Sequence, residues 1–113
     1  MSHFAEIKPN GLVIRVVSAE PDIINNGVLG DPLRFVQTSY NAKFRNKFAT
    51  SNDIYDRNLD MFISPKPFLS WVLDMYEDDD EIPRARWVAP VKKPSSTKNY
   101  VWKEETKKWV IKK

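Results

Sequence analysis

Apolar and polar residues alternate over short runs in this chain, and turn-forming residues separate the runs. Residues 4–7 form one such run, and residues 12–17 form another that is rich in β-branched side chains, which favour strands. Between them lies Lys-Pro-Asn-Gly, a turn sequence because proline presets φ and Asn-Gly tolerates positive φ. The pattern predicts a β-hairpin. Five of the six positions in 12–17 are apolar, so we expect that strand to be covered on both faces and central in a sheet.

The pattern is less regular between residues 20 and 52. Prolines and glycines punctuate residues 20–34, which we expect to form a loop with a helical turn at 22–24. Residues 33–40 return to β character. In residues 41–52, two phenylalanines lie four positions apart, which suits one face of a short helix. This segment is therefore predicted to be a short helix or a loop.

The second half of the chain repeats one pattern three times: an aromatic run, a polar turn and a second aromatic run. The three copies occupy residues 54–63, residues 71–91 with an acidic insertion, and residues 100–111. The pattern predicts three β-hairpins, because aromatic side chains that face each other across strands contribute roughly 0.2–1 kcal/mol per pair. Residues 103–108 could instead form a helical turn, given their Glu and Lys content. Paired prolines close the first two copies and form stiff extended spacers.

Together these elements predict a mainly β fold, with a β-rich α+β arrangement as the alternative. A chain of 113 residues has the usual size of one domain. We therefore expect a single domain over residues 1–113. Residues 1–52 would form an N-terminal antiparallel sheet with a short helix or loop. Residues 53–113 would form tandem aromatic β-hairpins joined by proline spacers.

The composition and the N-terminal sequence indicate in which cellular compartment the protein is made. The chain has no cysteine, so disulfides and thiolate metal sites are excluded. Its N-terminus lacks the basic and apolar regions of a secretory signal, and no apolar run reaches the ~20 residues that span a bilayer. We expect a protein made in a cytosol, with no membrane partner.

The sequence contains few residues in arrangements that suit catalysis or metal binding. His3 is the only histidine, and no nucleophile or second metal ligand accompanies it. The acidic residues 77–81 are consecutive and lack the spacing and glycine of a calcium loop, so we interpret them as a solvated turn. No serine occupies a Gly-x-Ser-x-Gly setting, and no glycine-rich phosphate loop occurs. We expect no enzyme activity, no cofactor and no metal.

The aromatic residues of the hairpins are the candidate partner-binding residues. Tryptophan buries a large area with few rotatable bonds and is common in binding hot spots. The candidates are Trp71, Trp87, Trp102, Trp109, Tyr55 and Phe62. The alternative is that these rings form the core of a small β module.

Charged segments suggest two other partners. Lys43, Arg45 and Lys47 lie among aromatic residues and could grip single-stranded nucleic acid, although three charges are a weak footprint. The net charge of +3 is small, which argues against a nucleic-acid partner. Residues 92–113 hold eight lysines against two glutamates. The acidic turn of one copy could meet this basic tail in the next copy, which would give self-association.

Several segments resemble known sequences. They are residues 1–7, 36–41, 46–49, 60–71, 87–91 and 100–110. In these segments the chain resembles small proteins encoded by tailed marine bacteriophages. The last two segments are also similar to the tryptophan-proline module of phage tail assembly chaperones. The acidic insertion at 75–83 and Thr50-Ser51-Asn52 depart from the pattern.

The resemblance implies a protein–protein interaction module in tail or virion assembly, similar to a tail assembly chaperone. Its partner would be a phage tail, fibre or other virion protein. One alternative is a permanent small subunit of the tail, baseplate or capsid. A second is a host-takeover protein that binds nucleic acid or a host protein. The expected location is the host cytoplasm during assembly, and the virion if the chain is retained there.

Overall fold

The computed structural model describes residues 2–94 and 97–112 and has a mainly β fold, as the sequence predicts. The chain divides into two compact units. Unit 1 comprises Met1–Pro65 and Met75–Ala85, and unit 2 comprises Lys66–Asp74 and Arg86–Lys113. One hairpin therefore contributes to both units. The expectation of a single domain stays a prediction.

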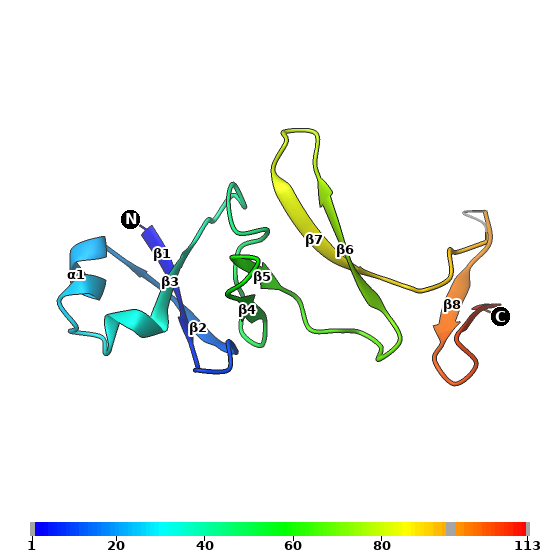
Figure 1. Cartoon of the computed structure of the whole chain (residues 1–113), viewed down its shortest axis with the longest axis horizontal. Coiled ribbons are helices and arrows are strands. Elements are labelled where there is room, and N and C mark those ends of the chain that lie inside the picture. Colours follow the sequence, from blue (N-terminus) through cyan, green and yellow to red (C-terminus); the bar gives the residue numbers. More distant parts are fainter. Residues whose placement is uncertain (1, 95–96, 113) are drawn as a thin grey trace. The chain divides into compact units, whose positions relative to one another are not determined.

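Unit 1 begins with a three-stranded antiparallel sheet (Figure 1). Its strands are β1 (Ser2–Ile7), β2 (Val13–Ala19) and β3 (Phe35–Thr38), in the order β2-β1-β3. Ala5 lies opposite Val16 of β2 and Val36 of β3. The predicted first hairpin and the later return to β structure are thus confirmed.

The central strand is β1 and not β2, so the prediction that residues 12–17 would be central was wrong. Alternate side chains of β1 enter two cores on opposite faces of the sheet: Ala5 and Ile7 in one, Phe4 in the other. In β2, by contrast, the Ile14 side chain is 43% exposed. A run of apolar residues shows how hydrophobic a strand is, but burial on both faces depends on distant segments.

One short helix packs against a face of this sheet, and a 3-10 turn leads into its last strand. Helix α1 (Pro21–Asn25) starts with proline at a position that suits it, and its Ile24 packs with Phe4, Ala19 and Phe35. The predicted helical turn is therefore confirmed. A 3-10 turn, η1 (Pro32–Arg34), leads into β3; the Asp31 side chain caps it by accepting a hydrogen bond from the Leu33 amide.

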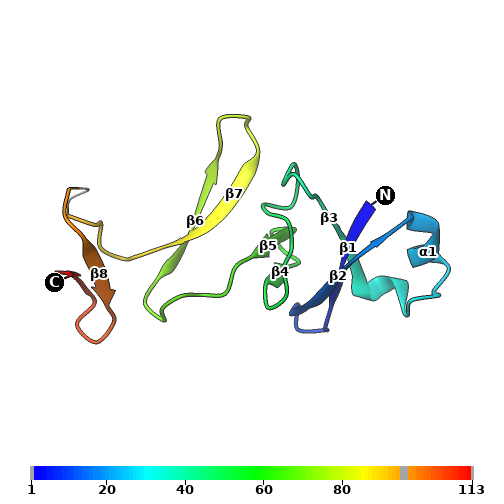
Figure 2. The ribbon, with the colours of Figure 1, turned by 180° about the vertical axis from the view of Figure 1, so that it is seen from behind.

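The segment between β3 and β4 is a loop, so of the two predicted forms the short helix with Phe44 and Phe48 on one face is wrong. Ala42, Arg45 and Asn46 have φ values of 54°, 57° and 75°, which no right-handed helix contains. The loop instead folds back on the rest of unit 1 (Figure 2).

Strands β4 (Ile54–Asp56) and β5 (Met61–Ile63) form the first of the three predicted aromatic hairpins. Asn46 fastens this hairpin to the next one. Its side-chain amide donates to the Phe62 and Ala85 carbonyls at 2.8 and 3.1 Å, and its oxygen accepts from the Ala85 amide at 2.9 Å. A buried side chain thus supplies hydrogen bonds that a neighbouring strand would supply in a sheet.

The other two hairpins are also confirmed. They are formed by β6 (Val72–Glu77) with β7 (Pro83–Val88), and by β8 (Tyr100–Lys103) with β9 (Lys108–Ile111). Residues 104–107 form the turn of the last hairpin, where a helical turn was the alternative; Lys107 has a φ of 53°. The paired prolines lie outside the strands, in the segments that connect one hairpin to the next.

Candidate functional site

Three of the four tryptophans pack together in unit 2. The register of β8 and β9 places Trp102 directly opposite Trp109, with ring centroids 5.3 Å apart and planes at 73°. The Trp71 ring lies 6.1 Å from each of them, and Phe68 extends the cluster at 5.4 Å from Trp71. Tilted and edge-on contacts at these distances are favourable because ring edges and faces carry opposite partial charge. We call these four side chains the ring cluster.

The carboxylate of Glu104 links the two segments that carry the ring cluster. Glu104 accepts hydrogen bonds from the Ser70 hydroxyl at 2.6 Å, the Ser70 amide at 3.0 Å and the Trp102 indole nitrogen at 2.8 Å. These hydrogen bonds, first that of the Ser70 hydroxyl and then that of Trp102, lower the pKa of Glu104 below its ordinary value. The Trp109 indole donates to the Val91 carbonyl at 2.7 Å. The cluster is therefore joined to three separate segments of unit 2.

The tryptophan side chains of the ring cluster are buried or partly buried. Trp102 is buried, with 9% of its surface exposed, and Trp71 and Trp109 are partly buried. The large hydrophobic side chains that unit 2 exposes are all aliphatic. They are Leu69, Val72, Val91, Val101 and Ile111. The rings thus form much of the interior of unit 2, and aliphatic side chains dominate its apolar surface.

The remaining candidate aromatic residues lie elsewhere. Trp87 is partly buried, and the Lys66 ammonium group lies 5.4 Å from its ring centroid. Tyr55 and Phe62 face each other across β4 and β5, with centroids 5.2 Å apart. Phe62 is fully buried in the core of unit 1, which removes it from any contact surface. Sequence reasoning could not separate it from its neighbours, because all hairpin aromatics show the same alternation.

Tyr55 is half-buried and its hydroxyl bonds to Asp60, which also pairs with Arg45 at 2.8 Å. Burial, and then the hydrogen bond to Asp60, raise the pKa of Tyr55 above its ordinary value. The same hydrogen bond is the main cause that lowers the pKa of Asp60. Tyr55 is thus committed to a polar network inside unit 1.

The candidate nucleic-acid residues are mostly engaged within the chain. The Arg45 guanidinium pairs with Asp60, and Lys47 pairs with the buried carboxylate of Asp53 at 3.0 Å. Lys43 is exposed. Two of the three cations are thus neutralised locally, which disfavours a phosphate contact at this segment.

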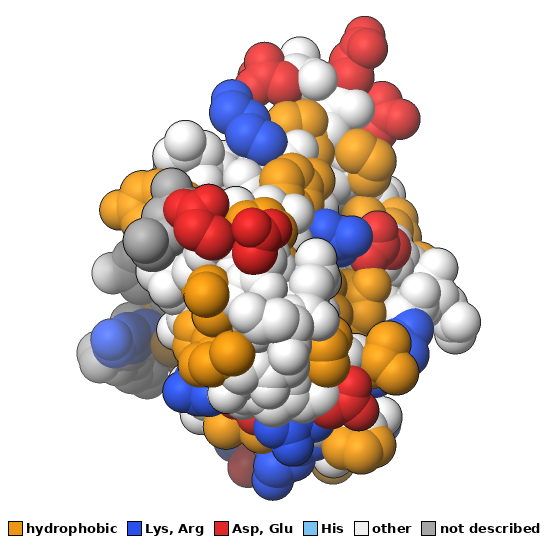
Figure 3. Space-filling model, turned by 90° about the vertical axis from the view of Figure 1, so that its left-hand side faces the viewer, with side chains coloured by type: hydrophobic (Ala, Val, Ile, Leu, Met, Phe, Trp, Pro, Cys, Tyr) orange, Lys and Arg blue, Asp and Glu red, His pale blue; other side chains and the backbone are white. Residues whose placement is uncertain are grey.

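The acidic residues 77–81 form the tip of the β6–β7 hairpin, at the top of Figure 3. Asp78 organises the tip: its side chain accepts from the amides of Asp80 and Ile82 at 2.9 and 3.0 Å and pairs with Arg84 at 2.9 Å. These contacts, led by the Ile82 amide, lower the pKa of Asp78. The other four acidic side chains are exposed. The tip is a fixed anionic surface.

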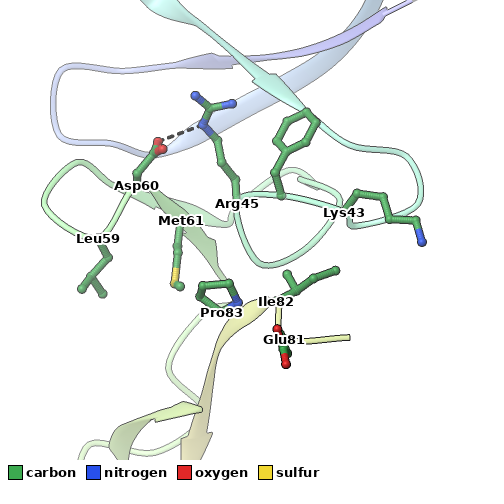
Figure 4. Close-up of a pocket in the computed structure, with 9 residues that line it drawn as sticks. Lys43, Arg45, Leu59, Asp60, Met61, Glu81, Ile82 and Pro83 are labelled. Atoms are coloured by element: carbon green, nitrogen blue, oxygen red, sulfur yellow. Dashed lines mark hydrogen bonds and ion pairs between the residues drawn. The ribbon is translucent and has the colours of Figure 1, made fainter. Parts of the chain in front are cut away.

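A pocket of about 340 Å³ lies in unit 1 beside this tip (Figure 4). Its lining combines apolar side chains with charges of both signs. The residues are Lys43, Phe44, Arg45, Leu59, Asp60, Met61, Glu81, Ile82 and Pro83. The ion pair between Arg45 and Asp60 occupies one side of it. The lining contains no histidine, serine or threonine.

Among residues 2–94 and 97–112, no group of three or more His, Asp or Glu side chains is placed to hold a metal ion. Within the same ranges, no helix has the length and apolarity that crossing a membrane requires. No family model matches the chain, and neither a curated protein nor a solved structure shows detectable similarity to it.

Proposed function

We propose that the chain is a protein–protein interaction module that acts in assembly of a tailed-phage particle, and that unit 2 makes the contact. The observation that supports this contact surface is that aromatic side chains fill the interior of unit 2 while aliphatic side chains lie on its surface. Its rings pack on one another, while Leu69 is 87% exposed and Ile111 is 52% exposed. We infer that these exposed aliphatic side chains make the contact, because exposed apolar patches mark protein-binding surfaces.

The energetics suit a reversible contact. Burying one aliphatic side chain fully contributes about 1.5–3 kcal/mol, and five partly exposed ones contribute several kcal/mol in total. Association costs about 4–15 kcal/mol of lost freedom, so the net affinity would be modest. The ring cluster lowers this cost because the supporting hairpin is already ordered before binding.

The phage setting rests on the resemblance of residues 60–71, 87–91 and 100–110 to phage proteins, including the tryptophan-proline module of tail assembly chaperones. On this proposal, the partner is a tail or fibre protein with an apolar surface that must stay covered until assembly. A permanent small subunit would use the same surface. The two versions differ only in whether the chain remains in the particle.

The test is the affinity of the purified chain for tail and fibre proteins of the phage that encodes it. Replacing Leu69 by Ser should weaken binding, because the exposed leucine lies on unit 2. Leu33→Ser is the matched control, since Leu33 is 83% exposed but belongs to unit 1. Equal affinities for both variants and the unchanged chain would refute the assignment of the surface. Mass spectrometry of purified particles then separates a departing chaperone from a retained subunit.

A further inference from the structure

The ring cluster covers one face of the β8–β9 hairpin, and the other face points outward. In the register of this hairpin, Val101 pairs with Val110 and Lys103 pairs with Lys108. Side chains alternate between the faces of a strand, so these four lie opposite the face that carries Trp102 and Trp109. Val101 is 41% exposed, and both lysines are exposed. We call this surface the valine–lysine face.

The two lysines of this face lie in an unfavourable arrangement. Lys103 and Lys108 are directly opposite each other across the strands, and like charges in that position destabilise a hairpin. Within the described residues, neither lysine is ion-paired. An anionic partner placed over the face would relieve their repulsion.

Charge is divided unequally between the two units. Unit 2 contains ten Lys and Arg residues against three Asp and Glu residues, a net charge of +7. Unit 1 contains eight against twelve, a net charge of −4. Two copies of this chain therefore carry surfaces of opposite sign that can attract each other over a distance of about 8–10 Å at ordinary salt concentrations.

The hairpin tip of unit 1 matches the valine–lysine face in chemistry. Asp79, Asp80 and Glu81 are exposed there, and the contacts of Asp78 hold the turn in one conformation. On the strand that leads to the tip, Met75 is 47% exposed. This hairpin thus offers carboxylates and an exposed apolar side chain, and the face offers ammonium groups beside valines. A preformed turn loses little conformational entropy when it docks.

We propose that the chain self-associates, with the acidic tip of one copy docking on the valine–lysine face of a second copy. The contact joins two different surfaces, so in a pair one copy keeps a free face and the other a free tip. Further copies can therefore add, and the assembly grows as a ring or an open chain. The surfaces are small, which makes the contact weak, reversible and sensitive to salt. The inference does not depend on the identity of any phage partner.

A second copy fits these surfaces better than a nucleic acid does. Nonspecific single-strand binding needs aromatic rings that are free to stack with bases. In unit 2 the indoles of Trp71, Trp102 and Trp109 pack against one another instead. The valines of the outward face have no use in phosphate binding but suit the exposed Met75 of the strand that leads to the acidic tip.

Sedimentation velocity of the full chain tests the proposal. At about 0.01 M salt, where charges act over about 30 Å, we expect the sedimentation coefficient to rise with protein concentration. At about 1 M salt, where the range is about 3 Å, we expect a monomer. A monomer at all concentrations in low salt would overturn the proposal. So would association that appears only when a single-stranded oligonucleotide is added.

Charge reversals locate the contact. Lys103→Glu with Lys108→Glu, and separately Asp79→Lys with Asp80→Lys, should each weaken self-association at least about tenfold. The chain with all four changes should associate again, as should an equimolar mixture of the two double variants.

The matched control is Lys92→Glu with Lys98→Glu, two exposed lysines outside the strands, which changes the net charge of unit 2 equally but leaves the valine–lysine face intact. It should weaken association by less than about threefold. A control that associates as weakly as the face variant, or failure of the four changes to restore association, would show that overall charge rather than this contact is responsible and would overturn the proposal.

Discussion

Replacing Asn46 by Ala should strongly destabilise unit 1. Asn46 is 9% exposed and makes three side-chain hydrogen bonds, one to the Phe62 carbonyl and two to the backbone of Ala85. Phe62 is fully buried and Ala85 is 9% exposed, so water would reach the abandoned groups poorly. Each lost bond costs about 1 kcal/mol, and more where the partner stays unsatisfied.

The backbone adds to this cost. Asn46 has a φ of 75°, which asparagine tolerates and alanine adopts only at a cost of about 1 kcal/mol. The expected total for Asn46→Ala is therefore about 4 kcal/mol, a large share of the ~5–15 kcal/mol of a typical domain. Asn46→Gly keeps the backbone relaxed and loses only the hydrogen bonds, so it should cost about 3 kcal/mol.

The assay is urea denaturation followed by far-UV circular dichroism, with amide hydrogen exchange to locate the effect. All four tryptophans belong to unit 2, so their fluorescence reports that unit separately. We expect the free energy of unfolding to fall by the stated amounts, and faster exchange at Ala85, whose amide donates to Asn46. A loss below about 1 kcal/mol for Asn46→Ala would refute the view that this side chain joins the two hairpins.

Three further predictions concern other parts of the molecule. Hydrogen bonds lower the pKa of Glu104 below 4.5, so the stability they contribute is present above that pH and is lost as the pH falls through the lowered pKa. The unfolding midpoint followed by tryptophan fluorescence should fall over this pH range in the unchanged chain, and it should not show this dependence in Glu104→Gln. Trp102→Ala should cost about 3–5 kcal/mol in the same assay, whereas Leu69→Ala should change stability by less than about 0.5 kcal/mol; similar effects of the two would contradict the assignment of core and surface. Gly11→Ala places a Cβ 2.6 Å from a backbone carbonyl oxygen of β4, at a residue whose φ is 92°. It should lower the melting temperature more than Gly27→Ala, because the Cβ at residue 27 would lie 3.7 Å from its nearest neighbour.

Local features of the fold could be predicted from the sequence. The three aromatic hairpins and the first hairpin are each specified by alternation of side chains and by a turn sequence between the strands. The proline that starts α1 is likewise a local signal. Such elements are predictable because their determinants lie within about ten residues of one another.

Features that depend on distant contacts could not be predicted. The choice of β1 as central strand depends on which strand has both faces covered by segments from elsewhere in the chain. The spacing of Phe44 and Phe48 suggested a helix, but Arg45 and Asn46 adopt left-handed backbone conformations, and their side chains bond to the turn and strand of the β4–β5 hairpin. The order of residue types contains no sign of these bonds.

The same limit applies to the candidate site. The sequence indicated that the second half is rich in aromatic side chains, but not which of them would meet. The register of β8 and β9 places Trp102 and Trp109 together on one face, which turns Val101 and Val110 to the other. The sequence indicated a basic tail over residues 92–113, but not that two of its lysines would share a face with two valines. Only the pairing of the strands reveals that these four residues share a surface.

The central claim is that the rings of unit 2 form its core while its outward side chains make contacts with another polypeptide. The most direct measurement is low-salt sedimentation of Val101→Thr with Val110→Thr, combined with tryptophan fluorescence of the same sample. Threonine keeps the β-branched shape, so the hairpin should persist and the emission should stay unchanged, while self-association weakens about tenfold. Unchanged association, or an emission spectrum shifted to that of water-exposed indole, would contradict the account.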